Sequence, residues 1–332
     1  MEKSEKSQQQ SQTATAPLIL IRSPELGTLI AVLGLSLIIG FVNPRFWLPS
    51  NWLTIMRWFA GFALLAMGES MVLIIGGIDL SVGSMASLSS MIFAYLITEM
   101  SWDTWQAFIV TMVIAILVGL YHAAVVVRFS PPLPTTVPAF IVTLGSLILL
   151  RGIAIGMTKG FPIKIYNESK IAFLASSQGI ALLVTIAGII TLLIQLRTVV
   201  GRYMYAIGGS LEAARVAGIP IHKARAFAFI YSSILASITG MLYAGLVASG
   251  YADIATGQEL YAIASCAIAG VSLAGGEGNA ISAILGALLI SIVRNGIVLM
   301  GVSPYWQDVG TALILVIAVI VDLTRRTLFA KV

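Results

Sequence analysis

Glu69, Asp79 and Arg294 are ionisable side chains that stand within or beside runs of apolar residues. A charge at the centre of a bilayer costs about 2.5–3.5 kcal/mol on insertion scales, so it normally faces a cavity or a partner. The chemistry open to such residues is the passage of an ion or a polar solute. For Arg294, extension of the side chain to the membrane surface explains its position equally well. The sequence holds no P-loop, nucleophile elbow or zincin helix, so we predict no hydrolytic centre.

Asp79 has the most suggestive surroundings, because it lies in the glycine-rich run GGIDLSVGS. Gly76, Gly77 and Gly83 permit an unwound or tightly turned backbone, and Ser81 adds a hydroxyl. Broken helices at membrane depth are tolerated only where they line a cavity or are buried in protein. Two interpretations follow. Either these five residues line a translocation path, or they form a short cytoplasmic turn that the aspartate caps.

A second glycine-rich break, AGVSLAGGEGNA at 269–280, loosely echoes the first. Paired interrupted segments in the two halves of a membrane protein favour an internal repeat around a translocation path. Two independent turns would explain the same residues, and the flanking apolar runs do not align cleanly.

The segment from Arg197 to Arg225 is a long polar break in the second half of the chain. Its cations outnumber its one acid, Glu212, and Lys and Arg beside apolar runs are typical of cytoplasmic loops because they resist translocation. The cations are Arg197, Arg202, Arg215, Lys223 and Arg225.

A short helix with both ends marked is predicted inside this loop, over 211–217. Ser210 is a good N-cap, and Glu212 places negative charge beside the positive helix end. Gly218 can adopt the left-handed conformation after the helix, and Pro220 prevents its continuation. A short helix held between two membrane spans is well placed to be pushed by a partner.

Composition decides the fold class. Of the 332 residues 58% are hydrophobic and only 10% charged, whereas a soluble domain carries about 25% charged residues. We predict an all-α integral membrane protein, a polytopic bundle of about ten transmembrane helices. The one cysteine, Cys266, excludes an internal disulfide or a cysteine zinc cluster. The predicted spans are roughly 26–42, 57–76, 83–98, 105–127, 138–158, 179–196, 226–248, 258–274, 279–300 and 307–323.

Most Lys and Arg residues fall on the side that holds the N-terminus and the central loop, so we expect both termini to be cytoplasmic. The cations are loop markers, and no nucleic-acid partner is predicted. Segments 159–178 and 249–260 would form the external face. The organisation is a disordered cytoplasmic tail (1–24), a transmembrane domain (25–325) containing the cytoplasmic loop 197–225, and a cytoplasmic tail (326–332).

Five motifs in one order resemble those of a known family. They are GGIDLSVGS, PAFIVTLGSLILLRGIA, GRYMYAIGGSLEAARVAGI, AIAGVSLAGGEGN and RNGIVLMGVSPYWQDV. The set, from about residue 50 to 325, is similar to the permease subunits of bacterial ABC importers for monosaccharides, of the ribose type. This resemblance implies a multi-pass protein of the bacterial inner membrane that is not an enzyme and has no cofactor of its own. It also implies four kinds of partner: ABC ATPase subunits that bind the ATP, a periplasmic sugar-binding protein, a second permease copy or a paralogue, and membrane lipid.

The resemblance assigns roles residue by residue. The family's segment for coupling to the ATPase is similar to Glu-Ala-Ala-x-x-x-Gly, which falls here on Glu212, Ala213, Ala214 and Gly218. The family's GG-x-D-L-S signature falls on the run that contains Asp79 and Ser81, and it either touches the sugar or shapes the fold.

Two alternatives stay open on the sequence. An ion-coupled secondary transporter would use Glu69 with Asp79 as ionisable residues deep in the spans. An ABC permease for nucleosides or another small polar solute would share the same motifs.

Overall fold

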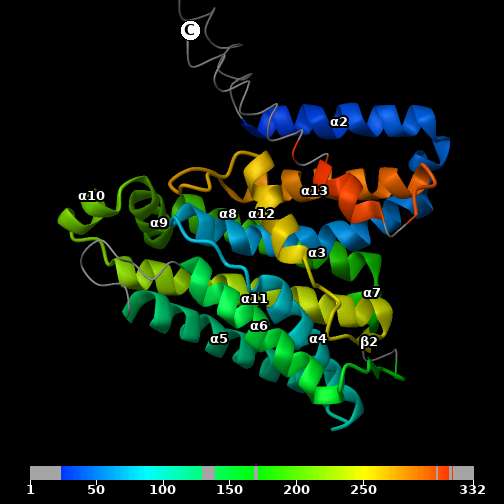
Figure 1. Ribbon diagram of the computed structural model, residues 1–332, viewed down its shortest axis with the longest axis horizontal. Coiled ribbons are helices and arrows are strands. Elements are labelled where there is room, and N and C mark those ends of the chain that lie inside the picture. The colour runs from blue at the N-terminus through cyan, green and yellow to red at the C-terminus, as the bar shows by residue number, and fades with distance from the viewer. Residues whose placement is uncertain (1–23, 129–138, 168–170, 304–305, 314–315, 317–332) are drawn as a thin grey trace, which may run out of the picture.

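The computed structural model describes residues 24–128, 139–167, 171–303, 306–313 and 316. The long helices run side by side along the long axis of the molecule (Figure 1), with α2 at one edge and α5 at the other. The elements are α2 (Pro24–Val42), η1 (Pro44–Trp47), α3 (Pro49–Ile74), α4 (Val82–Thr98), α5 (Thr104–Arg128), α6 (Ala139–Thr158), β1 (Ile163–Lys164), α7 (Ala172–Ala175), α8 (Ser177–Arg197), α9 (Val199–Gly209), α10 (Leu211–Val216), α11 (Ile221–Val247), β2 (Ser249–Gly250), α12 (Gln258–Ile268) and α13 (Ala280–Leu299).

Seven helices in the described part of the chain are long and apolar enough to cross a membrane: α2, α3, α5, α6, α8, α11 and α13. The predicted third and eighth spans correspond to α4, with 17 residues, and α12, with 11. The predicted tenth span, 307–323, lies mostly outside the described residues, as do the predicted tails except for Pro24. The chain is therefore a multi-pass helical membrane protein.

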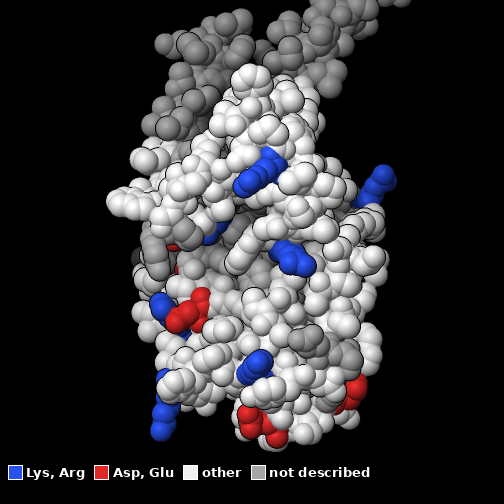
Figure 2. Space-filling model, turned by 90° about the vertical axis from the view of Figure 1, so that its right-hand side faces the viewer, with Lys and Arg blue, Asp and Glu red and all other residues white. Residues whose placement is uncertain are grey.

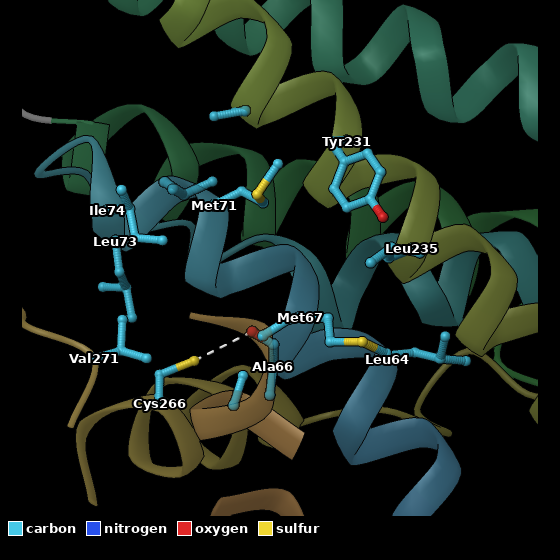
Figure 3. Packing of buried hydrophobic residues seen from close by; sticks show 14 of the residues in the cluster. Leu64, Ala66, Met67, Met71, Leu73, Ile74, Tyr231, Leu235, Cys266 and Val271 are labelled. Atoms are coloured by element: carbon cyan, nitrogen blue, oxygen red, sulfur yellow. Dashed lines mark hydrogen bonds between the residues drawn. The ribbon is translucent and has the colours of Figure 1, made fainter. Parts of the chain in front are cut away.

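Helices α3 and α11 form the centre of the bundle. In its most apolar window α3 is 89% buried, against 28% for both α2 and α6, which present apolar side chains outward. Figure 3 shows Met67 and Met71 of α3 packed near Tyr231 and Leu235 of α11. The outer helices thus present outward residues that lipid accepts, whereas Glu69, Asp79 and Gln195 lie buried within the bundle.

The two ends of the bundle differ. Helix α10 lies at one end, and α7 and β2 lie at the other (Figure 1). At the second end β1 pairs with β2, and Arg151 forms a 2.9 Å ion pair with Asp253. The segments 159–178 and 249–260, expected to share the external face, therefore meet at one end.

The start of α2 lies at the same end as α10. Glu25 accepts hydrogen bonds from Asn279 (Nδ2, 3.0 Å) and Ser282 (Oγ, 3.1 Å), at the beginning of α13. The loop before α13 in turn contacts Gly208 of α9, which leads directly into α10. The start of α2 and the central loop, predicted to lie on one side of the membrane, are thus at one end of the bundle.

Candidate functional site

The first glycine-rich break begins with a closed helix end. Gly76 has a φ of +76° and follows the last residues of α3. Its N–H donates to the carbonyl of Leu73 (2.8 Å), and the N–H of Gly77 donates to that of Val72 (2.9 Å). This pair of bonds is a Schellman motif, in which the left-handed position favours glycine. The first glycine therefore ends α3, and the chain can turn inside the bundle.

Asp79 is fully buried in this break. Its Oδ1 accepts from the N–H (2.9 Å) and the hydroxyl (2.6 Å) of Ser81, and its Oδ2 accepts from the hydroxyl of Ser232 in α11 (3.2 Å). Its own N–H donates to Oε1 of Glu69 in α3 (3.1 Å). Asp79 thus holds the break against two central helices. The break is a turn in which Asp79 bonds the residue just before α4, and its carboxylate faces protein on every side.

Gly83, at the start of α4, is a point of close packing. A Cβ there would overlap Oε2 of Glu259 and lie 2.6 Å from the carbonyl of Ala255, so the N-terminus of α12 sits directly on α4. On another side of the break, Thr143 of α6 donates to the carbonyl of Ile78 (3.2 Å). Of the residues predicted to line a path, Asp79, Ser81 and Gly83 are buried among packed helices, whereas Gly76 is exposed and Gly77 is half-buried.

The two glycine-rich breaks lie against each other. The N–H of Gly276 donates to the carbonyl of Ile74, the last residue of α3 (2.9 Å). A Cβ on Gly275 would lie 3.0 Å from the nitrogen of Gly76. The loose sequence echo between the breaks therefore corresponds to a spatial pair at the end of the bundle that carries α10.

A third glycine joins this contact from α9. A Cβ on Gly208 would overlap the carbonyl of Ile74 and the nitrogen of Gly276, so only glycine fits without a shift. The hydroxyl of Tyr205, one turn earlier in α9, donates to the carbonyl of Gly278 (2.7 Å), and burial raises the pKa of this tyrosine. Helix α9 is thereby joined to both breaks immediately before α10 begins.

Helix α10 is present and capped as predicted, although it ends at Val216. The hydroxyl of Ser210 accepts from the N–H of Ala213 (3.2 Å). Gly218 has a φ of +71°, and the N–H of Ile219 donates to the carbonyl of Ala214 (3.0 Å), which closes the C-terminus as at the end of α3. The local chain thus specifies a short, stiff helix at both of its ends.

The matched coupling residues divide between the two faces of α10. Ala214 is 3% exposed and packs inward, whereas Glu212, Ala213 and Gly218 are exposed. Val216 is 86% exposed. An apolar surface with a carboxylate beside it therefore projects from the end of the bundle.

Arg294 does not merely extend to the membrane surface. Its Nη1 forms a 2.9 Å ion pair with Asp308, and its guanidinium lies 4.9 Å from the ring centre of Tyr261. No sequence pattern connects Arg294, Asp308 and Tyr261. Among the residues that the structure describes, no three His, Cys, Asp or Glu side chains gather as a metal ion would require.

Gln195 is a buried polar residue that the sequence reasoning missed. Its Nε2 donates to Ser70 of α3 (3.2 Å), and its Oε1 accepts the N–H of Ala280 at the start of α13 (2.7 Å). It therefore connects α8 to two further helices near the glycine contact. The available signal was an amide side chain near the end of an otherwise apolar run, at 179–196.

Comparison with known proteins gives the family. Residues 51–319 match the family described as the permease component of the branched-chain amino acid transport system. The chain belongs to this permease family. It is 32% identical to the ribose import permease protein RbsC of Escherichia coli K12 over 306 residues, covering 90% of this chain and 93% of that one. It is 30% identical to RbsC of Bacillus subtilis, with 90% and 92% covered, and 30% identical to the autoinducer 2 import system permease LsrC of Shigella flexneri, with 90% and 86% covered.

These relatives are permease components of ABC-type importers, and the resemblance seen in the five motifs is confirmed. The chain is accordingly a permease and not an enzyme.

Proposed function

We propose that this chain is the translocating subunit of an ATP-driven importer in a bacterial inner membrane, and that it carries a monosaccharide, ribose or a related sugar. The names of the relatives support a sugar or a similar small polar solute. Because the relatives are named for different solutes, their names support a class of solute and not one particular sugar. Membership of the permease family argues against an ion-coupled secondary transporter.

The observation that carries the proposal is helix α10. It is a two-turn helix with both ends closed, and it projects an exposed surface around Val216 from one end of the bundle. A membrane protein that receives force from a soluble ATPase needs such a rigid projection. We assign the contact with the ATPase to Glu212, Ala213 and Gly218, with Ala214 anchoring the helix to the bundle. ATP is bound and hydrolysed on the ATPase subunits.

The α10 end is cytoplasmic on this proposal, and both termini lie on that side. The opposite end, where β1 pairs with β2, faces the periplasm and receives the sugar-binding protein. A second copy of the permease, or a paralogue, completes the membrane part of the importer.

The proposed mechanism couples nucleotide to movement through packing. Closure of the ATPases on ATP displaces α10, and α9 transmits the displacement through Gly208 to the end of α3. The energy available is the difference in affinity of the ATPases for the two arrangements of the permease. Gly76, Gly77, Asp79, Ser81 and Gly83 then form the hinge beside the path, and the buried ones, Asp79, Ser81 and Gly83, line the path only in an arrangement that separates α3 from α4.

Cross-linking tests the proposal directly. Val216→Cys in α10 should form a cross-link to the ATPase that co-purifies with this chain, whereas Tyr166→Cys, 77% exposed at the other end, should form none. Cross-linking from residue 166 alone would overturn the assignment.

Coupling is measured separately. Glu212→Lys should leave membrane insertion intact and lower the ATPase activity that delivery of substrate stimulates, because a cation replaces the carboxylate on the contact surface. Stimulation equal to that of the unmodified protein would contradict the role of this residue.

A further inference from the structure

A cavity of about 610 Å³ opens in the half of the bundle away from α10. Its walls come from the first half of α3, the start of α12, the end of α13 and the helical segment 306–313. This volume falls within the roughly 300–1,000 Å³ typical of small-molecule sites. None of its lining residues belongs to the glycine-rich breaks, so it is a separate site from those described above.

Aromatic side chains form one part of the lining. Trp58 is half exposed, while Phe62 is buried with its ring centre 5.6 Å from that of Tyr261. Such rings offer broad apolar faces together with a polar edge or hydroxyl. A ligand with one flat apolar side can lie against Trp58, while Phe62, 1% exposed, supports the wall from behind.

The charged residues of the lining neutralise each other. Arg294 is paired with Asp308 at 2.9 Å, and the hydroxyl of Tyr261 donates to the same Asp308 oxygen (2.7 Å). Arg294 Nη2 also donates to Gln307 Oε1 (3.5 Å), and the guanidinium N–H groups left over offer donors while the second Asp308 oxygen offers an acceptor. Figure 2 shows this end of the molecule, where charged residues are few and scattered over a mostly uncharged surface. The cavity therefore suits a neutral polar ligand better than an ion.

Gln258 adds an ordered amide to the wall. Its Oε1 accepts from the hydroxyl of Tyr243 (2.7 Å), and its Nε2 donates to the carbonyl of Ile254 (3.3 Å). Because both ends of the amide are held, its orientation is fixed and its second N–H is placed by the scaffold. Fixed polar groups among apolar walls are what give a small-molecule site its selectivity.

We infer that this cavity binds a neutral polyhydroxylated solute, a monosaccharide, with a C–H face of the sugar ring on the aromatic side chains and its hydroxyls on the Arg294–Asp308 pair. The inference rests on the proposed function and adds the site and the selection rule. An amino acid is disfavoured, because its carboxylate would compete with Asp308 for the charge of Arg294 and would be repelled by the Asp308 carboxylate. A hydroxyl has no such competition, since it bonds to the pair without breaking it.

The chain offers a clean probe of the cavity. Its one cysteine, Cys266, is fully buried, so a cysteine introduced at Thr256 in the lining is the thiol that a water-soluble maleimide reaches. D-ribose should slow labelling of Thr256→Cys in the purified permease, by about fivefold at four times the dissociation constant. Labelling of Phe161→Cys, 72% exposed outside the cavity at the same end, should not change. Leu260→Cys, a second lining position, replaces the first variant if that one fails to fold.

Two further variants test the selection rule on the Thr256→Cys background. Trp58→Ala should abolish protection by D-ribose, measured as the ratio of the labelling rates of that variant with and without the sugar. Asp308→Asn leaves Arg294 uncompensated, so D-ribonate should protect this variant severalfold better than it protects the parent. L-leucine should protect neither.

Three results would overturn the inference: equal protection by L-leucine and D-ribose, no protection by any of D-ribose, D-xylose and D-galactose, or no gain for D-ribonate in Asp308→Asn. The cross-link from Val216 does not depend on the cavity. Loss of sugar protection with that cross-link intact therefore removes this inference alone, whereas loss of the cross-link removes the proposed function.

Discussion

Replacing Asp79 with alanine should destabilise the bundle because three donors lose one acceptor group. The donors are the N–H and the hydroxyl of Ser81, at 2.9 and 2.6 Å, and the hydroxyl of Ser232, at 3.2 Å. A buried donor left unpaired costs about 1–3 kcal/mol. Serine hydroxyls can rotate toward backbone carbonyls, so part of this cost is recovered. We expect a net loss of about 2–5 kcal/mol in the free energy of unfolding.

The buried thiol of Cys266 supplies the assay. It is fully buried and donates to the carbonyl of Ala66 at 3.2 Å (Figure 3), so a thiol-reactive dye reports unfolding during a thermal ramp in detergent. At about 2 °C per kcal/mol, the lower end of the range for domains of 150–250 residues, Asp79→Ala should lower the midpoint by roughly 4–10 °C.

The matched control is Asp79→Asn. Its amide oxygen can still accept from Ser81, and its NH₂ group can donate to the hydroxyl of Ser232. We therefore expect Asp79→Asn to lower the midpoint by no more than about one third of the decrease caused by Asp79→Ala. If Asp79→Ala unfolds at the same midpoint as the unmodified protein, the hydrogen bonds of Asp79 do not stabilise the break. If the asparagine variant falls as far as the alanine variant, the negative charge and not the hydrogen bonding is what matters.

Two further predictions concern the segment that leads into α10. Gly208→Val should lower the midpoint of Cys266 labelling, since over-packing against the carbonyl of Ile74 costs about 1–3 kcal/mol. The control is Gly209→Ala, which should leave the midpoint unchanged because the space around Gly209 is open. Equal shifts in the two variants would refute the argument. Ser210→Ala removes the cap of α10, worth about 1 kcal/mol, so substrate-stimulated ATPase activity should fall in the reconstituted importer while the unfolding midpoint falls by no more than about 2 °C. Normal stimulation in this variant would contradict the role of the cap in coupling.

Local chemistry was readable from the sequence. The cap at Ser210, the left-handed Gly218 and the stop at Pro220 each act within a few residues, so the helix between them could be predicted almost to its ends. The long apolar runs also predicted the seven helices of spanning length in the described part of the chain, since length and composition suffice to identify them.

Contacts between distant segments were not readable. The position of Asp79 depends on its hydrogen bond with Ser232, 153 positions later in the chain, and the residues around Asp79 do not identify that partner. Extension to the membrane surface was a sufficient explanation for Arg294 when only its own apolar run was considered. The ion pair with Asp308 depends on the packing of two segments of the chain. The predicted span 83–98 corresponds to α4, a 17-residue helix whose deep burial in the bundle its own residues do not reveal.

Helix α3 is the element that connects the two proposed sites. Its last residue, Ile74, touches Gly208, and its first half supplies Trp58 to the cavity wall, about 24 Å away at 1.5 Å per residue. Backbone meets backbone at the glycine contact, and packed interiors transmit displacement because they have little free space to absorb it. On the proposed function, a push on α10 therefore tilts α3 as a rigid rod and moves Trp58 relative to Arg294 on α13. The movement that the ATPases cause would open the sugar site at the far end. A looser contact between Gly208 and the end of α3 would leave ATP hydrolysis intact but no longer coupled to this opening.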